Sequence, residues 1–406
     1  MTDIRELGII AVVLSCARLK GIIVTYDKEL LEFIQKAVQT QSYSDEEGAM
    51  AELVKKEMQK LGFDEAFIDS TGNAVGKIGN GPICVHFDSH IDTVRVDDAE
   101  EWTVAPFSGE ISGGCIWGRG SVDMKSALCA SVYAAALSKE MGCTEGKTVY
   151  ITGTVCEEYC DGESLKHLYD ELSLMPDYCV ICEPSNNVIT LGHKGKAQIR
   201  IKTYGVSAHG SAPEKGVNAV YEMAEIISRV DALNKSLFKA DDPHGTVALS
   251  DISCVSASLN AIPGECAIYL DRRLAVGETQ EQVKKEMDGL IRDKNASWEV
   301  GTLHHTSWTG KALDYEPMHT PWKIDIDHPL TIACNNAYQK SFGRPPDRYD
   351  FWDFGTNAVT PVGMGIPTVG FGPGDYKLAH MRDEKCEVES VMNALRFYTA
   401  LIGELE

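Results

Sequence analysis

The chain has 406 residues, of which 44% are hydrophobic, and its formal net charge is -22. This length and composition predict a globular protein of more than one domain and exclude a disordered or fibrous chain. The acidic balance argues against nucleic acid or an anionic membrane as a partner, because the long-range field would repel both. Thirteen cysteines without a repeating framework indicate reduced thiols and a cytoplasmic location.

The N-terminus holds an apolar stretch, GIIAVVLSCA at residues 8–17, that is too short to span a bilayer. Its acidic flank is atypical of a signal peptide, although Cys16 leaves lipid modification as an alternative. A further possibility is that the native chain starts near Val24, just before an amphipathic helix predicted at 25–39.

Helices and short apolar strands alternate through the first half of the chain. The periodicity predicts helices at 46–62 and 124–142, and strands at 66–79, from Ile83 onward, at 148–156 and at 177–184. This alternation predicts an α/β fold with a mostly parallel sheet covered on both faces. Ligands of such sheets bind beyond the carboxyl ends of the strands.

A second unit interrupts the first. Its predicted order is strand 196–205, helix 216–233, strands 245–255 and 265–274, helix 279–293 and strand 297–305, which is typical of a ferredoxin-like α+β sandwich. A helix at 328–343 and a strand at 366–372 then resume the first pattern. We therefore expect a discontinuous metal-binding catalytic domain, residues 1–193 and 309–406, with an inserted lid and dimerisation domain at 194–308.

The strand that begins at Ile83 carries four ionisable residues, His86, Asp88, His90 and Asp92, at alternate positions and so on one face. Buried charges are costly unless they are paired or bind a metal. The last two lie at the carboxyl end of the strand, where a site is expected. For His86 and Asp88, packing or local hydrogen bonds are the better explanation.

Further polar residues stand at the ends of other predicted strands or in adjoining loops: Asp123, the pair Glu157 and Glu158, Glu183, and His380. Each alone is weak evidence, since a single histidine or aspartate in a loop is more often structural. Together with His90, they are a plausible set of metal ligands. By contrast, Cys179 and Cys182 form a lone C-x-x-C in an apolar run, and we expect plain strand packing there.

From about residue 26 onward, H-x-D, D-x-K, E-E, E-P and a late histidine follow one another in a characteristic order. In this the chain resembles the dinuclear-zinc amidohydrolases and exopeptidases, which include acetylornithine deacetylase, succinyl-diaminopimelate desuccinylase, aminoacylase and the glutamate carboxypeptidases. Within that family, GTVCEEYCDGES, SAHGSAPEKG and DRRLAVGET most resemble the YgeY-type hydrolases linked to selenium metabolism.

The resemblance implies two divalent metal ions, zinc by default with cobalt or manganese as alternatives. It implies that Asp123 bridges the two ions. His90 and Glu183 would complete the ligands of one ion, and Glu158 and His380 those of the other.

The same resemblance implies that a hydroxide between the ions attacks an amide-type C–N bond, with Glu157 as general base. Asp92 would orient the imidazole two residues before it. In the lid, His209 would stabilise the oxyanion, and Asn260 and Arg273 would bind a substrate carboxylate. In several relatives the lids pair into a homodimer, so that this histidine reaches the partner's site.

The expected substrate is a small carboxylated molecule, such as an N-acyl or ureido amino acid or a dipeptide. Two alternatives stay open from the sequence: an inactive metal- or ligand-binding homologue, and a monomer whose own lid closes over its own site. Asn357 replaces an aspartate found in many relatives, which leaves fine substrate specificity open.

Overall fold

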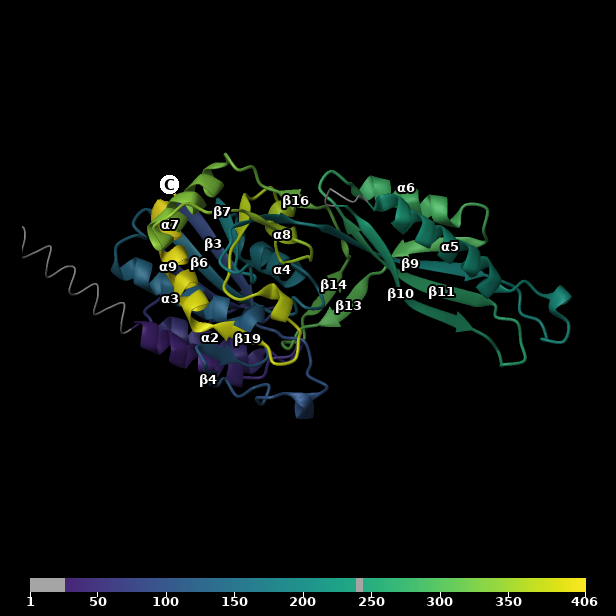
Figure 1. Cartoon of the computed structure of the whole chain (residues 1–406), viewed down its shortest axis with the longest axis horizontal. Helices are drawn as coiled ribbons and strands as arrows, with labels where there is room; N and C mark the ends of the chain where they lie inside the picture. Colours follow the sequence, from purple (N-terminus) through teal and green to yellow (C-terminus); the bar gives the residue numbers. More distant parts are fainter. Residues whose placement is uncertain (1–25, 239–243) are drawn as a thin grey trace, which may run out of the picture.

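The computed structural model describes residues 26–238 and 244–406. Within these ranges the chain forms two main sheets, each with its own hydrophobic core, toward opposite ends of an elongated molecule (Figure 1). The apolar stretch at 8–17, with Cys16, lies outside the described residues. In the described ranges, every helix is too short or too polar to cross a membrane.

The larger sheet has nine of the described strands, in the spatial order β1-β2-β6-β3-β7-β18-β8-β16 with β17 also paired to β8. In chain order these strands are β1 (Glu65–Ile68), β2 (Ala74–Gly79), β3 (Ile83–His90), β6 (Lys147–Thr154), β7 (Tyr178–Ile181), β8 (Thr190–His193), β16 (Trp322–Lys323), β17 (Asp350–Trp352) and β18 (Thr368–Gly370).

This sheet is mixed, so the prediction of a mostly parallel sheet was wrong at its edges. The central strands β6, β3, β7 and β18 run parallel. By contrast, β1, β2 and β16 each pair with their neighbours in antiparallel fashion, and β8 is antiparallel to β18. The predicted strand at 66–79 is in fact the hairpin β1–β2. Asp69 turns the chain there, because its carboxylate accepts the backbone N–H groups of Thr71, Gly72 and Asn73. Strands joined by so short a turn must be antiparallel.

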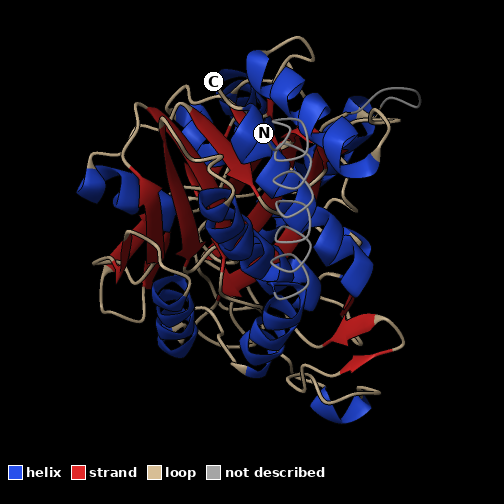
Figure 2. Cartoon of the chain, turned by 90° about the vertical axis from the view of Figure 1, so that its left-hand side faces the viewer, coloured by secondary structure: helices blue, strands red, loops and turns tan. Residues whose placement is uncertain are grey.

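Helices cover both faces of the larger sheet (Figure 2). They are a helix at 26–39, α2 (Gly48–Lys60), α3 (Ser126–Glu140), α4 (Glu163–Leu172), α7 (Pro329–Phe342), α8 (Val359–Gly363) and α9 (Val388–Glu404). Successive side chains of β3 identify the two faces, since Phe87 packs on Tyr398 of α9 and His86 packs on Tyr169 of α4. The alternation expected for a strand is therefore present in β3.

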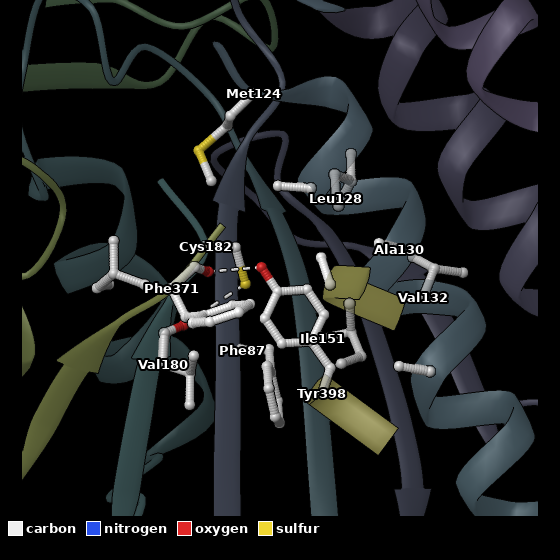
Figure 3. Packing of buried hydrophobic residues seen from close by; sticks show 14 of the residues in the cluster. Phe87, Met124, Leu128, Ala130, Val132, Ile151, Val180, Cys182, Phe371 and Tyr398 are labelled. Atoms are coloured by element: carbon white, nitrogen blue, oxygen red, sulfur yellow. Dashed lines mark hydrogen bonds between the residues drawn. The ribbon is translucent and has the colours of Figure 1, made fainter. Parts of the chain in front are cut away.

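Aromatic and aliphatic side chains fill the space between β3, β7 and the helices α3 and α9 (Figure 3). The Phe371 ring stacks on Phe397 with centroids 3.7 Å apart, and the Tyr398 hydroxyl donates to the Phe371 carbonyl at 2.6 Å. Cys179 and Cys182 are buried free thiols of this core, as the sequence predicted.

The second sheet has the spatial order β10-β11-β9-β12, and β15 also pairs with β9. Its elements in chain order are β9 (Gly195–Tyr204), α5 (Ala219–Leu237), β10 (Thr246–Val255), β11 (Glu265–Leu274), α6 (Gln280–Ile291), β12 (Ala296–Val300) and β15 (Met318–His319). Apolar residues of α5 and α6, such as Met223 and Met287, pack with Ile199 and Leu270 of the strands in a separate core.

Two strands replace the single one predicted at 297–305. The chain turns at Gly301, whose N–H donates to the Gln198 carbonyl at 2.8 Å, and a Cβ there would lie 2.5 Å from the Tyr269 ring. Beyond this turn, β13 (Leu303–Thr306) pairs with β14 (Ala312–Tyr315) and packs against the larger core. A small sheet of β4 (Ile111–Ser112), β5 (Cys115–Trp117) and β19 (Lys385–Glu387) completes the fold.

Candidate metal centre

His90 is the last residue of β3, and its imidazole is buried. Its Nδ1–H donates to the Asp92 carbonyl at 2.9 Å, because a carbonyl oxygen can only accept. This leaves Nε2 directed at two carboxylates, 2.8 Å from Asp123 Oδ1 and 3.8 Å from Glu183 Oε1. The imidazole is therefore held in the tautomer that offers Nε2 to a metal.

Asp123 lies between the two candidate histidine ligands. Its Oδ1 faces His90, and its Oδ2 lies 3.2 Å from His380 Nε2. The segment Ser121–Lys125 carries this residue just before α3, and the peptide bond between Asp123 and Met124 is cis. A carboxylate with one oxygen toward each imidazole is suited to bridging two cations.

The pair Glu157 and Glu158 follows β6 on a tight turn that Asp92 organises. The two carboxylate oxygens of Asp92 accept the backbone N–H groups of Glu157 and Glu158, each at 3.1 Å, and one also accepts the Ser44 hydroxyl at 2.8 Å. The same carboxylate lies 3.5 Å from His90 Nδ1. Asp92 thus accepts the imidazole N–H through its backbone carbonyl rather than through the expected carboxylate, and the carboxylate instead fixes the glutamate turn, a role that sequence reasoning missed.

The remaining ligand candidates come from β7 and from a late loop. Glu183 follows β7 and packs against Gly372, where a Cβ would lie 2.4 Å from the Glu183 carbonyl oxygen. His380 lies in a loop with a φ of 61°, and its Nε2 is 3.1 Å from Glu158 Oε1. His90 and Glu183 therefore lie beside Oδ1 of Asp123, and His380 and Glu158 lie beside Oδ2.

A buried ion pair, also missed from the sequence, joins two of these loops. Glu384 Oε1 accepts the N–H groups of Val122 and Asp123 at 2.8 and 3.1 Å, while Oε2 accepts from Arg119 Nη1 at 2.7 Å. Arg119 also donates to the carbonyls of His380 and Met381. The only sequence signal for this pair was the presence of an arginine near the D-x-K motif and of a glutamate near the late histidine. That the two side chains pair is visible only in the tertiary fold.

The charge of the cluster fits divalent cations. Four carboxylates, Asp123, Glu157, Glu158 and Glu183, face only two imidazoles, so with all four carboxylates ionised the cluster is anionic even when both histidines are protonated. Buried anions are costly unless compensated. Ligand atoms of His90, Asp123 and Glu158 lie within 4.8 Å of one another, as do those of His90, Glu157 and Glu183. The mixed His and carboxylate set suits zinc and related ions.

Burial sets the protonation tendencies of the cluster. It raises the pKa of Glu157 well above its usual value, and the neighbouring Glu183 and Asp161 carboxylates add to the effect, while His90 opposes it. Burial lowers the pKa of His90, but the carboxylates of Asp123 and Asp92 outweigh it and hold that pKa well above the usual value. Hydrogen bonds to Asp123 and Glu158 raise the pKa of His380 to about 10.

A cavity of about 280 Å³ opens beside the cluster. Arg273, predicted to bind a substrate carboxylate, lines it together with Glu157 and His380. His209 and Asn260, the other two predicted lid residues, are exposed and do not line it. They neighbour each other instead, since His209 forms a β-bridge with Ala261 and the Asn260 carbonyl accepts from Gly210 N–H at 2.6 Å.

His86 and Asp88 are satisfied by hydrogen bonds, as expected. His86 contacts the Tyr169 and Thr152 hydroxyls at 2.7 and 2.8 Å. Asp88 accepts from Thr152 at 2.6 Å and from Asn357 Nδ2 at 2.8 Å. An aspartate at 357 would set two carboxylates against each other, so Asn357 fits this core.

Comparison with known proteins places the chain among metallopeptidases. Residues 86–404 match the model of peptidase family M20/M25/M40. The uncharacterised protein YgeY of Escherichia coli K12 is 36% identical over 380 residues, covering 93% of this chain and 94% of that protein. A probable succinyl-diaminopimelate desuccinylase of Staphylococcus epidermidis is 24% identical, covering 92% and 96%. The structure of Bacillus subtilis YxeP, described as a dinuclear metal-binding peptidase, shares the fold with a TM-score of 0.66 at 12% identity, covering 93% and 98%.

Proposed function

This chain belongs to peptidase family M20/M25/M40 and is an amide-bond hydrolase, and from that premise we propose that it uses two divalent metal ions to hydrolyse a small carboxylated amino acid derivative. One observation carries the proposal: Asp123 faces His90 with one carboxylate oxygen and His380 with the other. The dinuclear description of the YxeP structure supports the same number of ions.

In this proposal His90 and Glu183 would hold one ion, Glu158 and His380 would hold the other, and Asp123 would contribute to both. When bound, such ions lower the pKa of a water molecule and polarise an amide carbonyl. Asp92 and the Arg119–Glu384 pair keep the ligand loops in place.

Glu157 is the proposed general base. It lies beside the ligands but contacts the cavity, so its carboxylate can accept a proton from the attacking water and transfer it to the leaving nitrogen. The ligands and the base converge on one cavity, and no observation favours the inactive alternative.

The proposed substrate carries a carboxylate that Arg273 binds. This guanidinium lines the cavity and is already held by Asp271 at 2.7 Å, which fixes its orientation. The desuccinylase relative and the peptidase family name both support amide substrates derived from amino acids. Ureido compounds stay in the proposed class. The cytoplasmic location and the link to selenium metabolism stay predictions.

We further propose that the lid predicted at 194–308 pairs two chains through its ferredoxin-like part, β9 to β12, since β13 packs against the larger core. The default metal is zinc, with cobalt or manganese as alternatives. Support for pairing comes from the position of His209 and Asn260, outside the cavity of their own chain. The same end of the lid exposes apolar side chains, namely Val206, Val217, Tyr221, Val255 and Leu259. Exposed apolar groups of this kind mark interaction surfaces.

A substrate panel tests the proposed function. Metal-loaded protein is assayed on N-acetyl and N-succinyl amino acids, ureido amino acids and dipeptides, each beside its carboxamide analogue. We expect turnover of at least one class, with a preference for the free carboxylate that Arg273→Ala removes by raising KM or lowering kcat/KM. Equal rates on acids and amides would contradict the carboxylate assignment. No turnover of any compound would contradict the function.

A further inference from the structure

The turn that carries Glu157 and Glu158 is held from behind by a second buried acid, Glu47, which the proposed hydrolysis does not use. Glu47 is the N-cap residue of α2 and is fully buried. Its Oε1 accepts the backbone N–H of Cys156 at 3.0 Å. Cys156 directly precedes the proposed base in the sequence. Glu47 therefore holds the first residue of the glutamate turn, residues 156–158.

Cys156 has a backbone conformation that needs such support. Its φ is 58°, in the left-handed region that residues with a side chain rarely adopt. Conformations of this kind persist only where the surrounding structure over-determines them, and they cluster at functional sites. Here three successive N–H groups of the turn are held, since Glu47 accepts the first and the carboxylate of Asp92 accepts the next two. Successive N–H groups in a turn form a cradle for acceptor oxygens, and two buried acids share this one.

Glu47 is itself fixed by the segment that leads into α2. The Thr93 N–H donates to the Ser42 carbonyl at 2.9 Å, so this segment runs beside the residues that follow β3. The Ser44 hydroxyl donates to Asp92 Oδ2 at 2.8 Å. Glu47 therefore reaches the glutamate turn from a segment that is anchored at the end of β3, the strand that carries the first histidine ligand.

The contact of Glu47 with the turn does not need an ionised carboxylate. Burial, together with the Asp92 carboxylate, raises the pKa of Glu47 well above its usual value. Its Oε2 is buried and has no hydrogen-bond partner among the described residues, and an ionised acid in such a place is costly. A neutral carboxyl group and a glutamine amide offer the same carbonyl acceptor to the Cys156 N–H. Glutamine is therefore a matched replacement at this position.

We propose that Glu47 is a positioning residue of this hydrolase, which fixes the backbone of Cys156 and so sets the direction in which the two glutamates of the turn point. Glu157 faces the cavity and Glu158 faces His380, whereas Glu47 does not line the cavity. The inference rests on the proposed function. A role in stability alone would be shared by any buried acid that accepts a hydrogen bond, so the test compares Glu47 with such an acid.

Glu47→Met removes the acceptor and keeps a side chain of similar length. At saturating metal, and on the compound of the substrate panel that the wild type hydrolyses fastest, we expect kcat and kcat/KM to fall together by about tenfold or more. KM should change little, because a displaced base weakens the transition state rather than substrate binding. Glu47→Gln should stay within about threefold of wild type, since the acceptor is kept. If Glu47→Met does not fold, Glu47→Asp takes its place with the same expected losses, because its carboxyl group is one methylene short of the Cys156 N–H.

Metal affinity provides a readout that does not need turnover. Glu158 lies on the same turn, so Glu47→Met should weaken metal binding about tenfold in a competition titration with a chromophoric chelator, and Glu47→Gln should not. If the wild type hydrolyses no compound but this difference in affinity is present, the positioning role stands and the proposed reaction fails. If the wild type is active and Glu47→Met matches it in kcat and metal affinity, the positioning role fails and the reaction stands.

Glu57 is the matched control. It lies on α2, is 9% exposed, and accepts the Tyr133 hydroxyl of α3 at 2.6 Å rather than an N–H group of the glutamate turn. Glu57→Met should destabilise the fold in urea unfolding while leaving kcat and metal affinity close to wild type. Losses of kcat and metal affinity in Glu57→Met as large as in Glu47→Met would overturn the proposal and leave Glu47 with a role in stability alone.

A last variant separates the backbone of Cys156 from its thiol. The thiol lies 3.5 Å from Glu47 Oε1 and 3.4 Å from Asp45 Oδ1. Cys156→Ala removes these two contacts and keeps the N–H group that Glu47 accepts, so its kcat and metal affinity should stay close to wild type. A loss in Cys156→Ala as large as that in Glu47→Met would assign the effect to the thiol and overturn the proposal.

Discussion

Arg119 and Glu384 lie 265 positions apart in the sequence and form a buried ion pair, with Arg119 Nη1 2.7 Å from Glu384 Oε2. Glu384 also holds the backbone of Asp123, and Arg119 holds the carbonyl of His380. One pair therefore links the loops of two proposed metal ligands.

The first prediction concerns this pair. Glu384→Gln keeps an acceptor for the backbone of Asp123 but leaves the buried Arg119 charge uncompensated. Removing one partner of a buried pair costs about 3–5 kcal/mol, and losing a group that positions ligands lowers metal affinity about 10- to 100-fold. Urea unfolding and a competition titration with a chromophoric chelator measure the two effects.

A matched control lies on the same loop. Arg382 pairs with Asp98 and Glu101 at the surface, and Arg382→Gln should leave both quantities close to wild type. If Glu384→Gln behaves like Arg382→Gln, the pair does not position the ligands.

The sequence predicted the convergence of the ligand candidates because strand ends of one sheet meet at one edge and because their motif order resembles that of a known family. His90, Asp123, Glu158 and Glu183 lie together as expected. The Arg119–Glu384 pair could not be predicted in this way, since neither residue's neighbours in the sequence reveal its partner.

Errors in the predicted fold have local causes. Hydrophobic alternation marked 66–79 as one strand, but the Asp69 turn divides it and reverses the chain. The same alternation continued through Gly301, where the chain also turns. Periodicity reports which residues are buried, whereas local hydrogen bonds, from the Asp69 side chain in one case and from the backbone in the other, decide where a strand ends.

A second prediction concerns acid stability. Burial lowers the pKa of His86 to about 3, below the ordinary value of about 6.5 that applies in the unfolded chain. As the pH falls below about 6.5, the unfolded state binds this proton first, so the free energy of unfolding falls by about 1.4 kcal/mol per pH unit until the folded pKa is reached. His86→Gln should make the pH dependence between pH 6 and pH 4 shallower by that amount. Urea unfolding of both proteins across this range provides the test, and parallel curves would refute it.

The third prediction separates the base from the ligands. Glu157→Gln should retain bound metal and lose turnover by roughly a hundredfold or more, because the amide cannot carry the proton. Asp123→Ala should instead lose metal, since it removes the proposed bridge. Metal analysis and initial rates on both variants provide the comparison. Normal turnover in Glu157→Gln would remove Glu157 from the mechanism.

A fourth prediction places His209 at the partner's site. His209→Ala and Glu157→Gln chains, each nearly inactive alone, are mixed and allowed to exchange subunits. If His209 acts across the interface, mixed dimers hold one complete site, and activity returns to about a quarter of wild type under random pairing. Absence of recovery despite verified exchange would show that His209 acts within its own chain, and a fully active His209→Ala protein would remove His209 from the reaction.

The central claim is that a dinuclear metal site in this cluster hydrolyses an amide bond. Elemental analysis of the purified protein, run beside turnover across a chelator titration, tests it most directly. We predict up to two zinc, cobalt or manganese ions per chain, activity that falls as the ions are removed, and recovery when they are returned. Full turnover in chelator by protein without bound metal would contradict the claim.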